Sequence, residues 1–222
     1  TIQVVDDEVP PEPTYLAEEF DALLGDSFDL DYKRLTFEWN GFGYGGFIES
    51  ITGFEIDISG TGTDLSLGGN DNELVSVGAG KTIPFHGADY SAFYVNSNGD
   101  VSFESGDSGN SNDLWYFFFR KRIAVLRDNL EVHVAGKILH QQLADRIVVQ
   151  YQGVNDGSSG SPNTCQIEMF FDGRIRMSWL QINALDPVVG LSNGVWESAT
   201  FEESDFSAWA GPPADPWQEW QL

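Results

Sequence analysis

The 222-residue chain has one cysteine, Cys165. A single thiol cannot form a disulfide within the chain, so no disulfide framework holds the fold together. Scarce cysteine pairing is typical of reducing compartments, but many exported bacterial domains also lack disulfides. The absence therefore leaves the compartment open. A chain of this length can bury enough surface to be stable without covalent links.

Basic residues are also scarce. The chain has 11 Lys and Arg residues against 35 Asp and Glu residues, and its formal net charge is −24. Nucleic acids are bound mostly through Lys and Arg contacts to phosphate, so we expect no nucleic-acid partner. Two explanations are open for the acidity. It can serve solubility in a salty or extracellular setting, or some carboxylates can gather to bind Ca²⁺.

Long apolar runs are missing. None approaches the ~20 residues that a membrane-spanning helix needs, which predicts that the chain does not insert into a membrane. No signal peptide is visible, and the chain begins at Thr1 rather than Met. We therefore expect a mature or excised piece of a larger protein.

The two ends differ in composition from the middle of the chain. Residues 1–13 are rich in proline and carboxylates, which predicts an extended acidic linker. Residues 14–210 are predicted to form one β-sandwich domain, and residues 211–222 a tail that contains proline and tryptophan. Tyr15 to Leu24 has apolar residues at helical spacing, so at most one short N-terminal helix is expected.

Hydrophobic residues recur with a period of two from Phe28 onward. Leu35, Phe37 and Trp39 alternate with polar residues, and Phe54 to Ile58 shows the same alternation. This period is typical of half-buried strands, so both segments are predicted to be strands.

The strongest turn signal is Asn98-Gly99, within Tyr94 to Phe103. Asn-Gly between short apolar runs is typical of a tight β-hairpin. Asp172-Gly173 repeats the pattern later in the chain. Roughly a dozen short strands with turn signals about every 8–12 residues, and no long helix, predict an all-β antiparallel β-sandwich of jelly-roll type.

Several segments follow one another in a characteristic order. Pro84 to Phe103 contains the Val-x-x-Asn-Gly hairpin, and four segments come after it: Arg122 to Leu130, Asp145 to Tyr151, Thr164 to Ile175 and Val189 to Ser192. Together these segments resemble nidogen-like modules, and are similar to modules in large secreted proteins of planctomycete-type and marine bacteria. The chain departs from the pattern at Arg127, where an aromatic or acidic residue is usual, and in the block Trp115 to Arg122.

This resemblance implies a β-rich module at an extracellular or cell-surface location. It implies a role in adhesion, or as an accessory to a secreted enzyme. Because the resemblance consists of hairpins rather than reactive groups, it implies no catalytic residue.

Two polar loops contain oxygen ligands of the kind that a structural Ca²⁺ prefers. Neither loop has the spacing of an EF-hand, and solvated turns are the more ordinary explanation of both. The candidate metal ligands are Asp64, Asn70, Asp71 and Glu73 in the first loop, and Asp107 and Asp113 in the second.

Trp115 to Phe119 is a run of five consecutive aromatic residues. Successive side chains of a strand point to opposite faces, so in a strand these rings could not all face one core. Either both faces are covered, or some rings are exposed and bind a ligand such as a sugar. The basic residues that follow either pair with local carboxylates or receive an acidic polysaccharide. The candidate ligand-binding residues are Trp115, Tyr116, Arg120, Arg122, Trp196 and Trp209.

Three functional hypotheses follow from these patterns. The first is a non-catalytic extracellular module that binds a protein or a polysaccharide in adhesion. The second is a carbohydrate-binding module that serves a secreted glycan-active enzyme. The third is a glycan-active enzyme, which would need two carboxylates about 5–10 Å apart in a cleft.

Overall fold

The computed structural model describes residues 15–132, 136–195 and 202–212. The predicted linker, residues 1–13, lies outside this part of the chain, as does most of the predicted tail at 211–222. The described residues form antiparallel strands and one short helix, α1 (Leu114–Phe118). None of their helices is long and apolar enough to cross a membrane.

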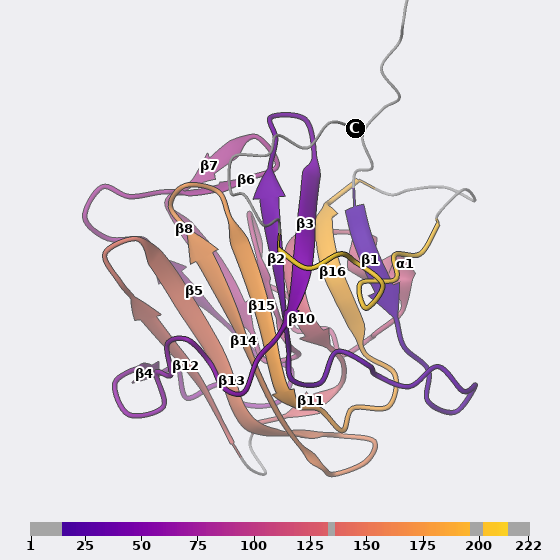
Figure 1. The fold of residues 1–222 in the computed structure, drawn as a ribbon. Helices are drawn as coiled ribbons and strands as arrows, with labels where there is room; N and C mark the ends of the chain where they lie inside the picture. The colour runs from indigo at the N-terminus through magenta and orange to yellow at the C-terminus, as the bar shows by residue number, and fades with distance from the viewer. Residues whose placement is uncertain (1–14, 133–135, 196–201, 213–222) are drawn as a thin grey trace, which may run out of the picture.

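Two antiparallel sheets form the layers of a sandwich (Figure 1). The six-stranded sheet contains, in spatial order, β1 (Tyr15–Glu19), β16 (Val188–Asn193), β10 (Lys121–Arg127), β9 (Asp100–Ser102), β8 (Ala92–Asn96) and β5 (Asn72–Ser76). The eight-stranded sheet contains β3 (Tyr44–Ser50), β2 (Lys33–Trp39), β15 (Ile175–Gln181), β14 (Pro162–Phe170), β13 (Arg146–Asp156), β12 (Lys137–Gln142) and β4 (Thr63–Asp64), with β11 (Leu130–Glu131) paired to β13. A separate hairpin is formed by β6 (Ile83–Phe85) and β7 (Ala88–Tyr90). The predicted all-β antiparallel class is confirmed.

The period-two pattern directs apolar side chains from both sheets into one core. Phe37 of β2 and Ile167 of β14 belong to the same buried cluster as Val95 of β8 and Val101 of β9. Burial of this apolar surface is the main driving force for folding. The predicted alternation of apolar and polar residues in β2 therefore decides which of its side chains, among them Leu35 and Phe37, point into the core.

Two large side chains also join the sheets through hydrogen bonds. The hydroxyl of Tyr151 in β13 lies 2.8 Å and 2.9 Å from the carbonyl oxygens of Asn96 and Asp100 in the other sheet. The indole Nε1–H of Trp179 in β15 donates to the carbonyl of Val125 at 2.7 Å. Buried Tyr and Trp side chains need such partners for their polar atoms. These contacts fix how one sheet lies over the other.

Both predicted hairpins are present, with a three-residue loop in the first. β8 pairs with β9 so that Asn96 lies opposite Asp100. Of the Asn98-Gly99 pair, only Gly99 has a positive φ, +85°, and a Cβ there would lie 1.8 Å from the carbonyl oxygen of Leu126. Glycine is therefore required at this position. Gly173, with φ +95°, plays the same part between β14 and β15.

Where a short helix or turn was predicted over Tyr15 to Leu24, the structure has a strand followed by a turn at residues 22–25, and no helix. Residues 15–19 form strand β1, which pairs along its length with β16, Tyr15 opposite Ser192. Isolated helices this short are marginal in water, whereas the edge of β16 offers a full ladder of hydrogen bonds. Leu23 and Leu24 lie at an exposed turn rather than on a buried face.

The prediction of a strand over Phe54 to Ile58 is wrong. This segment joins no ladder and instead covers the outer face of the eight-stranded sheet. The side chain of Gln150 accepts from the Ile58 N–H at 3.2 Å, and that of Gln166 donates to the Ile56 carbonyl at 2.8 Å. Its alternating apolar residues pack on Leu139 and Val148 of the sheet, which explains why the period resembled that of a strand.

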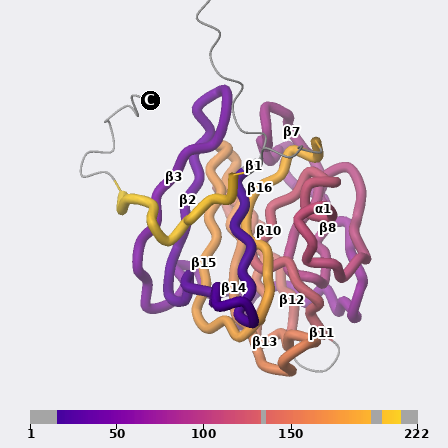
Figure 2. Tube along the Cα trace, turned by 90° about the vertical axis from the view of Figure 1, so that its right-hand side faces the viewer, coloured from indigo at the N-terminus to yellow at the C-terminus, as the bar shows by residue number. Residues whose placement is uncertain are grey.

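The C-terminal segment, residues 202–212, closes one side of the sandwich. The N–H of Ser204 donates to Ala17 of β1 at 2.8 Å, and Ala210 accepts from Ile48 of β3 at 3.1 Å. Between these contacts, Phe206 is fully buried. Figure 2 shows this yellow segment running between β1 and β3. It therefore covers an edge strand of each sheet, which limits edge-to-edge association.

A buried carboxyl group holds this C-terminal segment. Glu18 is 8% exposed and accepts a hydrogen bond from the N–H of Phe206 at 3.0 Å. Burial, with the nearby charges of Asp29, Asp205 and Glu203, raises the pKa of Glu18 to about 8. The carboxyl group is therefore protonated in the folded protein near neutral pH.

We expect the folded state to lose stability as pH rises through 8. The pKa of Glu18 lies near 4.5 ordinarily and about 8 when folded, so its contribution is complete below pH 4.5 and is lost as the pH rises from 4.5 through about 8. Glu18→Gln keeps a neutral acceptor for Phe206. Thermal midpoints of the variant and the parent should agree at pH 5, and the variant should melt higher at pH 9. Equal midpoints at pH 9 would contradict this assignment.

Candidate ligand-binding site

The run of five aromatic residues forms α1 and the residue that follows it, not a strand. Phe117 and Phe118 are buried, and they pack on Ala17, Ala124 and Val188 of the six-stranded sheet. The helix thus lies on the outer face of that sheet (Figure 2). The helical turn buries the adjacent rings of Phe117 and Phe118 on one face, whereas in a strand these two rings would point to opposite faces.

Three exposed rings, Trp115, Tyr116 and Phe119, form what we call the aromatic ridge. Their exposed fractions are 49%, 42% and 60%. Trp115 and Phe119 are one helical turn apart, and their rings stack with centroids 5.3 Å apart and planes 29° from parallel. Tyr116 meets Trp115 edge to face at 5.2 Å. The ridge is an exposed apolar surface, and the neighbouring residues Phe117 and Phe118 are buried against the sheet.

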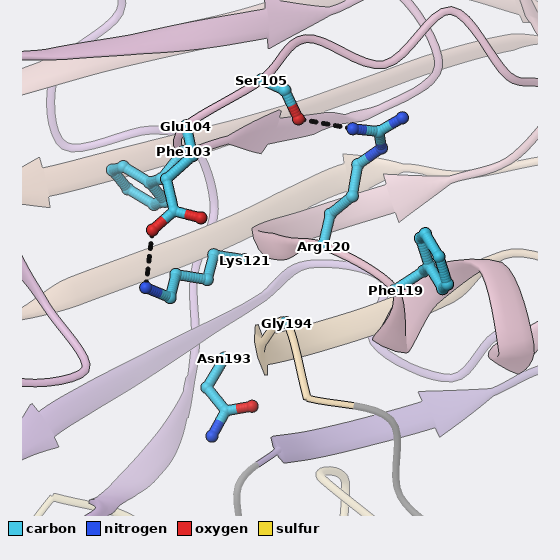
Figure 3. Close-up of a pocket in the computed structure, with 8 residues that line it drawn as sticks. All are labelled: Phe103, Glu104, Ser105, Phe119, Arg120, Lys121, Asn193 and Gly194. Atoms are coloured by element: carbon cyan, nitrogen blue, oxygen red, sulfur yellow. Dashed lines mark hydrogen bonds and ion pairs between the residues drawn. The ribbon is translucent and has the colours of Figure 1, made fainter.

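A pocket of about 270 Å³ adjoins the ridge at Phe119. We call it the Arg120 pocket (Figure 3). It is lined by residues from three parts of the chain: Phe103, Glu104, Ser105, Phe119, Arg120, Lys121, Asn193 and Gly194. Aromatic carbon and polar groups therefore meet at one opening, as is common in small-molecule and sugar sites.

The charged side chains of this pocket are held in place by neighbours. Lys121 donates to Glu104 at 2.7 Å and to the hydroxyl of Tyr90 at 3.1 Å. These two hydrogen bonds raise the pKa of Lys121 above its ordinary value. Arg120 donates to the hydroxyl of Ser105. Figure 3 shows both pairs at the mouth of the pocket.

Behind the pocket lies a closed cycle of two arginines and two aspartates, which we call the Arg–Asp ring. Arg122 contacts Asp100 at 3.0 Å and Asp107 at 2.9 Å. Arg127 contacts the same two carboxylates at 3.0 Å and 3.2 Å. All four side chains are between 0% and 4% exposed. Buried ions of this kind are tolerated only when they are paired.

The Arg–Asp ring connects the sheet to the loop that carries the ridge. Asp100, Arg122 and Arg127 belong to β9 and β10, whereas Asp107 belongs to the loop before α1. Arg122 also donates to the carbonyl of Tyr116 at 3.2 Å. Asn96 adds a further link, because its side chain accepts from the Asp107 N–H at 2.9 Å. The position of the aromatic ridge therefore depends on this buried ring.

The electrostatics of Asp107 agree with this arrangement. Burial alone would raise the pKa of Asp107, but the charge of Arg127, the N–H of Gly109 and the charge of Arg122 together hold it below its ordinary value. Asp107 is thus ionised throughout the neutral range, and the ring keeps its ion pairs.

The structure brings together three of the six predicted ligand-binding residues. Trp115, Tyr116 and Arg120 lie at the ridge and its pocket. Arg122 is fully buried in the Arg–Asp ring and cannot reach a ligand directly. Trp209 belongs to the C-terminal segment and packs on Phe37, and Trp196 lies outside the described residues.

Most of the predicted calcium ligands accept hydrogen bonds or ion pairs from other groups of the protein, and calcium binding stays a prediction. Asp107 is paired in the Arg–Asp ring. Asp64 accepts from the N–H of Ser66, Asp71 from that of Asn72, and Asp113 from the hydroxyl of Ser111. Asn70 accepts from the side chain of Asn98, and Glu73 is exposed on β5. Within residues 15–132, 136–195 and 202–212, no group of three or more His, Cys, Asp or Glu side chains is placed to hold a metal.

A second pocket, also of about 270 Å³, is lined almost entirely by carboxylates. Its lining residues are Glu18, Asp26, Asp29, Glu203, Ser204 and Asp205. One of them, Glu18, has a raised pKa and is bonded to the C-terminal segment. We call this the acidic pocket. Its lining includes no aromatic ring and no basic side chain among the described residues.

Sequence reasoning missed several residues of the site. Phe119 was part of the aromatic run, and its spacing of four from Trp115 would have placed both on one helix face. Glu104, Ser105 and Asn193 carry no local signal, because only the fold brings β16 and the loop after β9 to the same place.

Removing one carboxylate from the Arg–Asp ring should be costly. Asp100→Asn leaves Arg122 and Arg127 buried with Asp107 alone, and we expect the free energy of unfolding to fall by about 3–5 kcal/mol. The control is Arg120→Gln, at a partly exposed position, which should cost less than about 1 kcal/mol. Urea denaturation measures both. Similar losses for the two variants would show that the ring does not support the fold.

Comparison of the chain with models of protein families, with curated proteins and with solved structures found no match. The resemblance to nidogen-like modules therefore stays a prediction, and the function of the domain is inferred from the geometry of the site.

Proposed function

We propose that this domain is a non-catalytic adhesion module of a larger extracellular or cell-surface protein, and that it binds a polysaccharide. The observation that carries the proposal is the aromatic ridge beside the Arg120 pocket. Trp115 and Phe119 present stacked, half-exposed rings, and hydrogen-bonding groups lie next to them. Sugars have apolar ring faces and polar edges, so this combination suits them.

The construction of the ridge supports a binding role. Exposed aromatic surface is unfavourable in water, and large exposed apolar side chains commonly mark interaction sites. Here the rings are also fixed, because Phe117 and Phe118 anchor the helix and the Arg–Asp ring holds the preceding loop. A surface that is ordered before binding loses less entropy when the ligand arrives.

The acidic pocket favours a second candidate, a glycan-active enzyme. The observation that favours it is the raised pKa of Glu18, which lies beside other carboxylates. The general acids of glycosidases likewise have a raised pKa and a second carboxyl group nearby. Against it, Glu18 is bonded to the main chain of Phe206, and the pocket has no ring on which a sugar could stack. We therefore prefer the binding module.

Loss of either ridge ring should weaken polysaccharide binding. Trp115→Ala and Phe119→Ala should each weaken the affinity for polysaccharide by tenfold or more, because truncating an aromatic anchor costs ~2 kcal/mol of binding free energy. The affinity is measured from the retardation of the protein in gels that contain polysaccharide. Phe42→Ala is the matched control, since Phe42 is an exposed ring, 77% exposed, on the turn between β2 and β3. It should bind like the parent.

Two results would overturn the proposal. The first is unchanged binding in both ridge variants. The second is release of reducing ends from polysaccharide by the parent protein and not by Glu18→Gln, which would transfer the function to the acidic pocket.

A further inference from the structure

We propose that the polysaccharide is acidic, and that Arg120 selects it by pairing with a carboxylate or sulfate group while a neighbouring sugar ring stacks on Phe119. This inference rests on the proposed function and names the ligand class for the same site. It starts from the charges that the fold gathers behind the aromatic ridge.

The groups at this site carry a net positive charge, whereas the whole chain is strongly negative. Among the described residues, the carboxylates in contact with Arg120, Arg122 and Arg127 are two, Asp100 and Asp107. These five groups carry one excess positive charge. Lys121 is matched by Glu104 and leaves the balance unchanged. A chain of net charge −24 thus places a local positive charge next to the aromatic ridge.

Arg120 is the member of this group that a ligand can reach. Its side chain is 32% exposed, whereas those of Arg122 and Arg127 are fully buried. Its contact with Asp107, at 3.6 Å, is also longer than the contacts of 2.9 Å and 3.2 Å that the buried arginines make with the same carboxylate oxygen. Asp107 is therefore already neutralised, and Arg120 retains capacity for an incoming anion.

The neighbours of Arg120 suit a sugar acid more than a simple anion. Phe119 precedes it and lines the same pocket, so a ring stacked on Phe119 would place its substituents near the guanidinium group (Figure 3). Ser105 and Asn193 add neutral hydrogen-bonding groups to the lining. Arginine binds carboxylate and sulfate oxygens through paired N–H groups, which gives direction as well as charge.

The negative charge of the rest of the chain does not prevent this pairing. The Debye length is about 8 Å at physiological ionic strength, so distant exposed carboxylates are largely screened. A partly buried pair in direct contact is screened much less. Short-range contacts at Arg120 then decide whether an acidic polymer is bound.

The test compares matched polymers that differ in charge. Retardation by polygalacturonate and by neutral galactan, and by dextran sulfate and by dextran, is measured for the parent, Arg120→Gln, Arg120→Lys and Lys137→Gln. The last variant removes the same charge from a remote lysine that is 62% exposed. We expect the parent to bind at least one acidic polymer tenfold or more tightly than its neutral counterpart. Arg120→Gln should lose that preference, Arg120→Lys should keep part of it, and Lys137→Gln should match the parent.

Each other outcome has a definite meaning. Equal binding of neutral and acidic polymers, lost in Trp115→Ala, would overturn the selection of acidic sugars and leave the proposed function intact. A preference for acidic polymers that persists in Arg120→Gln, or falls equally in Lys137→Gln, would overturn the role of Arg120. No retardation by any of these polymers or by a wider polysaccharide panel would overturn the proposed function itself.

Discussion

The outer face that carries the aromatic ridge depends on two guanidinium groups buried against two carboxylates. Desolvating such groups is expensive, so they are stable only as a complete set. Arg122 and Arg127 come from a strand at the centre of the six-stranded sheet, and Asp107 comes from the loop above it. The ring therefore converts a polar loop with few apolar residues into a fixed part of the sandwich. The positions of Trp115 and Phe119 depend on that attachment together with the buried rings of Phe117 and Phe118.

Buried polar side chains also hold other segments onto the sandwich. Two long connecting segments lie across the sheets and are hydrogen-bonded to them. The segment at 51–62 covers the eight-stranded sheet through the amide groups of Gln150 and Gln166. The segment at 202–212 closes the side between β1 and β3, with Glu18 as its polar contact. In each case a buried polar group is satisfied by main-chain atoms of the covering segment, which makes the cover specific as well as apolar.

This construction explains how an acidic chain can present a local cationic surface. Water and salt screen the exposed carboxylates that lie at a distance from α1. The arginines near α1 are instead concentrated by the ring, with Arg120 at the exposed end. Rigid elements hold such a group within the small tolerance that recognition needs. The interpretation as a polysaccharide module unites the aromatic ridge, the pocket and this charge.

The sequence by itself determined the features that depend on neighbours in the chain. The period of two and the turns at Gly99 and Gly173 were sufficient for the all-β class, since a strand's inner face and a positive φ are local properties. Only the tertiary structure decided that Tyr15–Glu19 is a strand, because its hydrogen-bond partners in β16 lie some 170 residues away (Tyr15 opposite Ser192, a separation of 177). It likewise decided that Arg120 faces the pocket while Arg122 is buried, because desolvation is set by what folds over a side chain and not by its sequence neighbours.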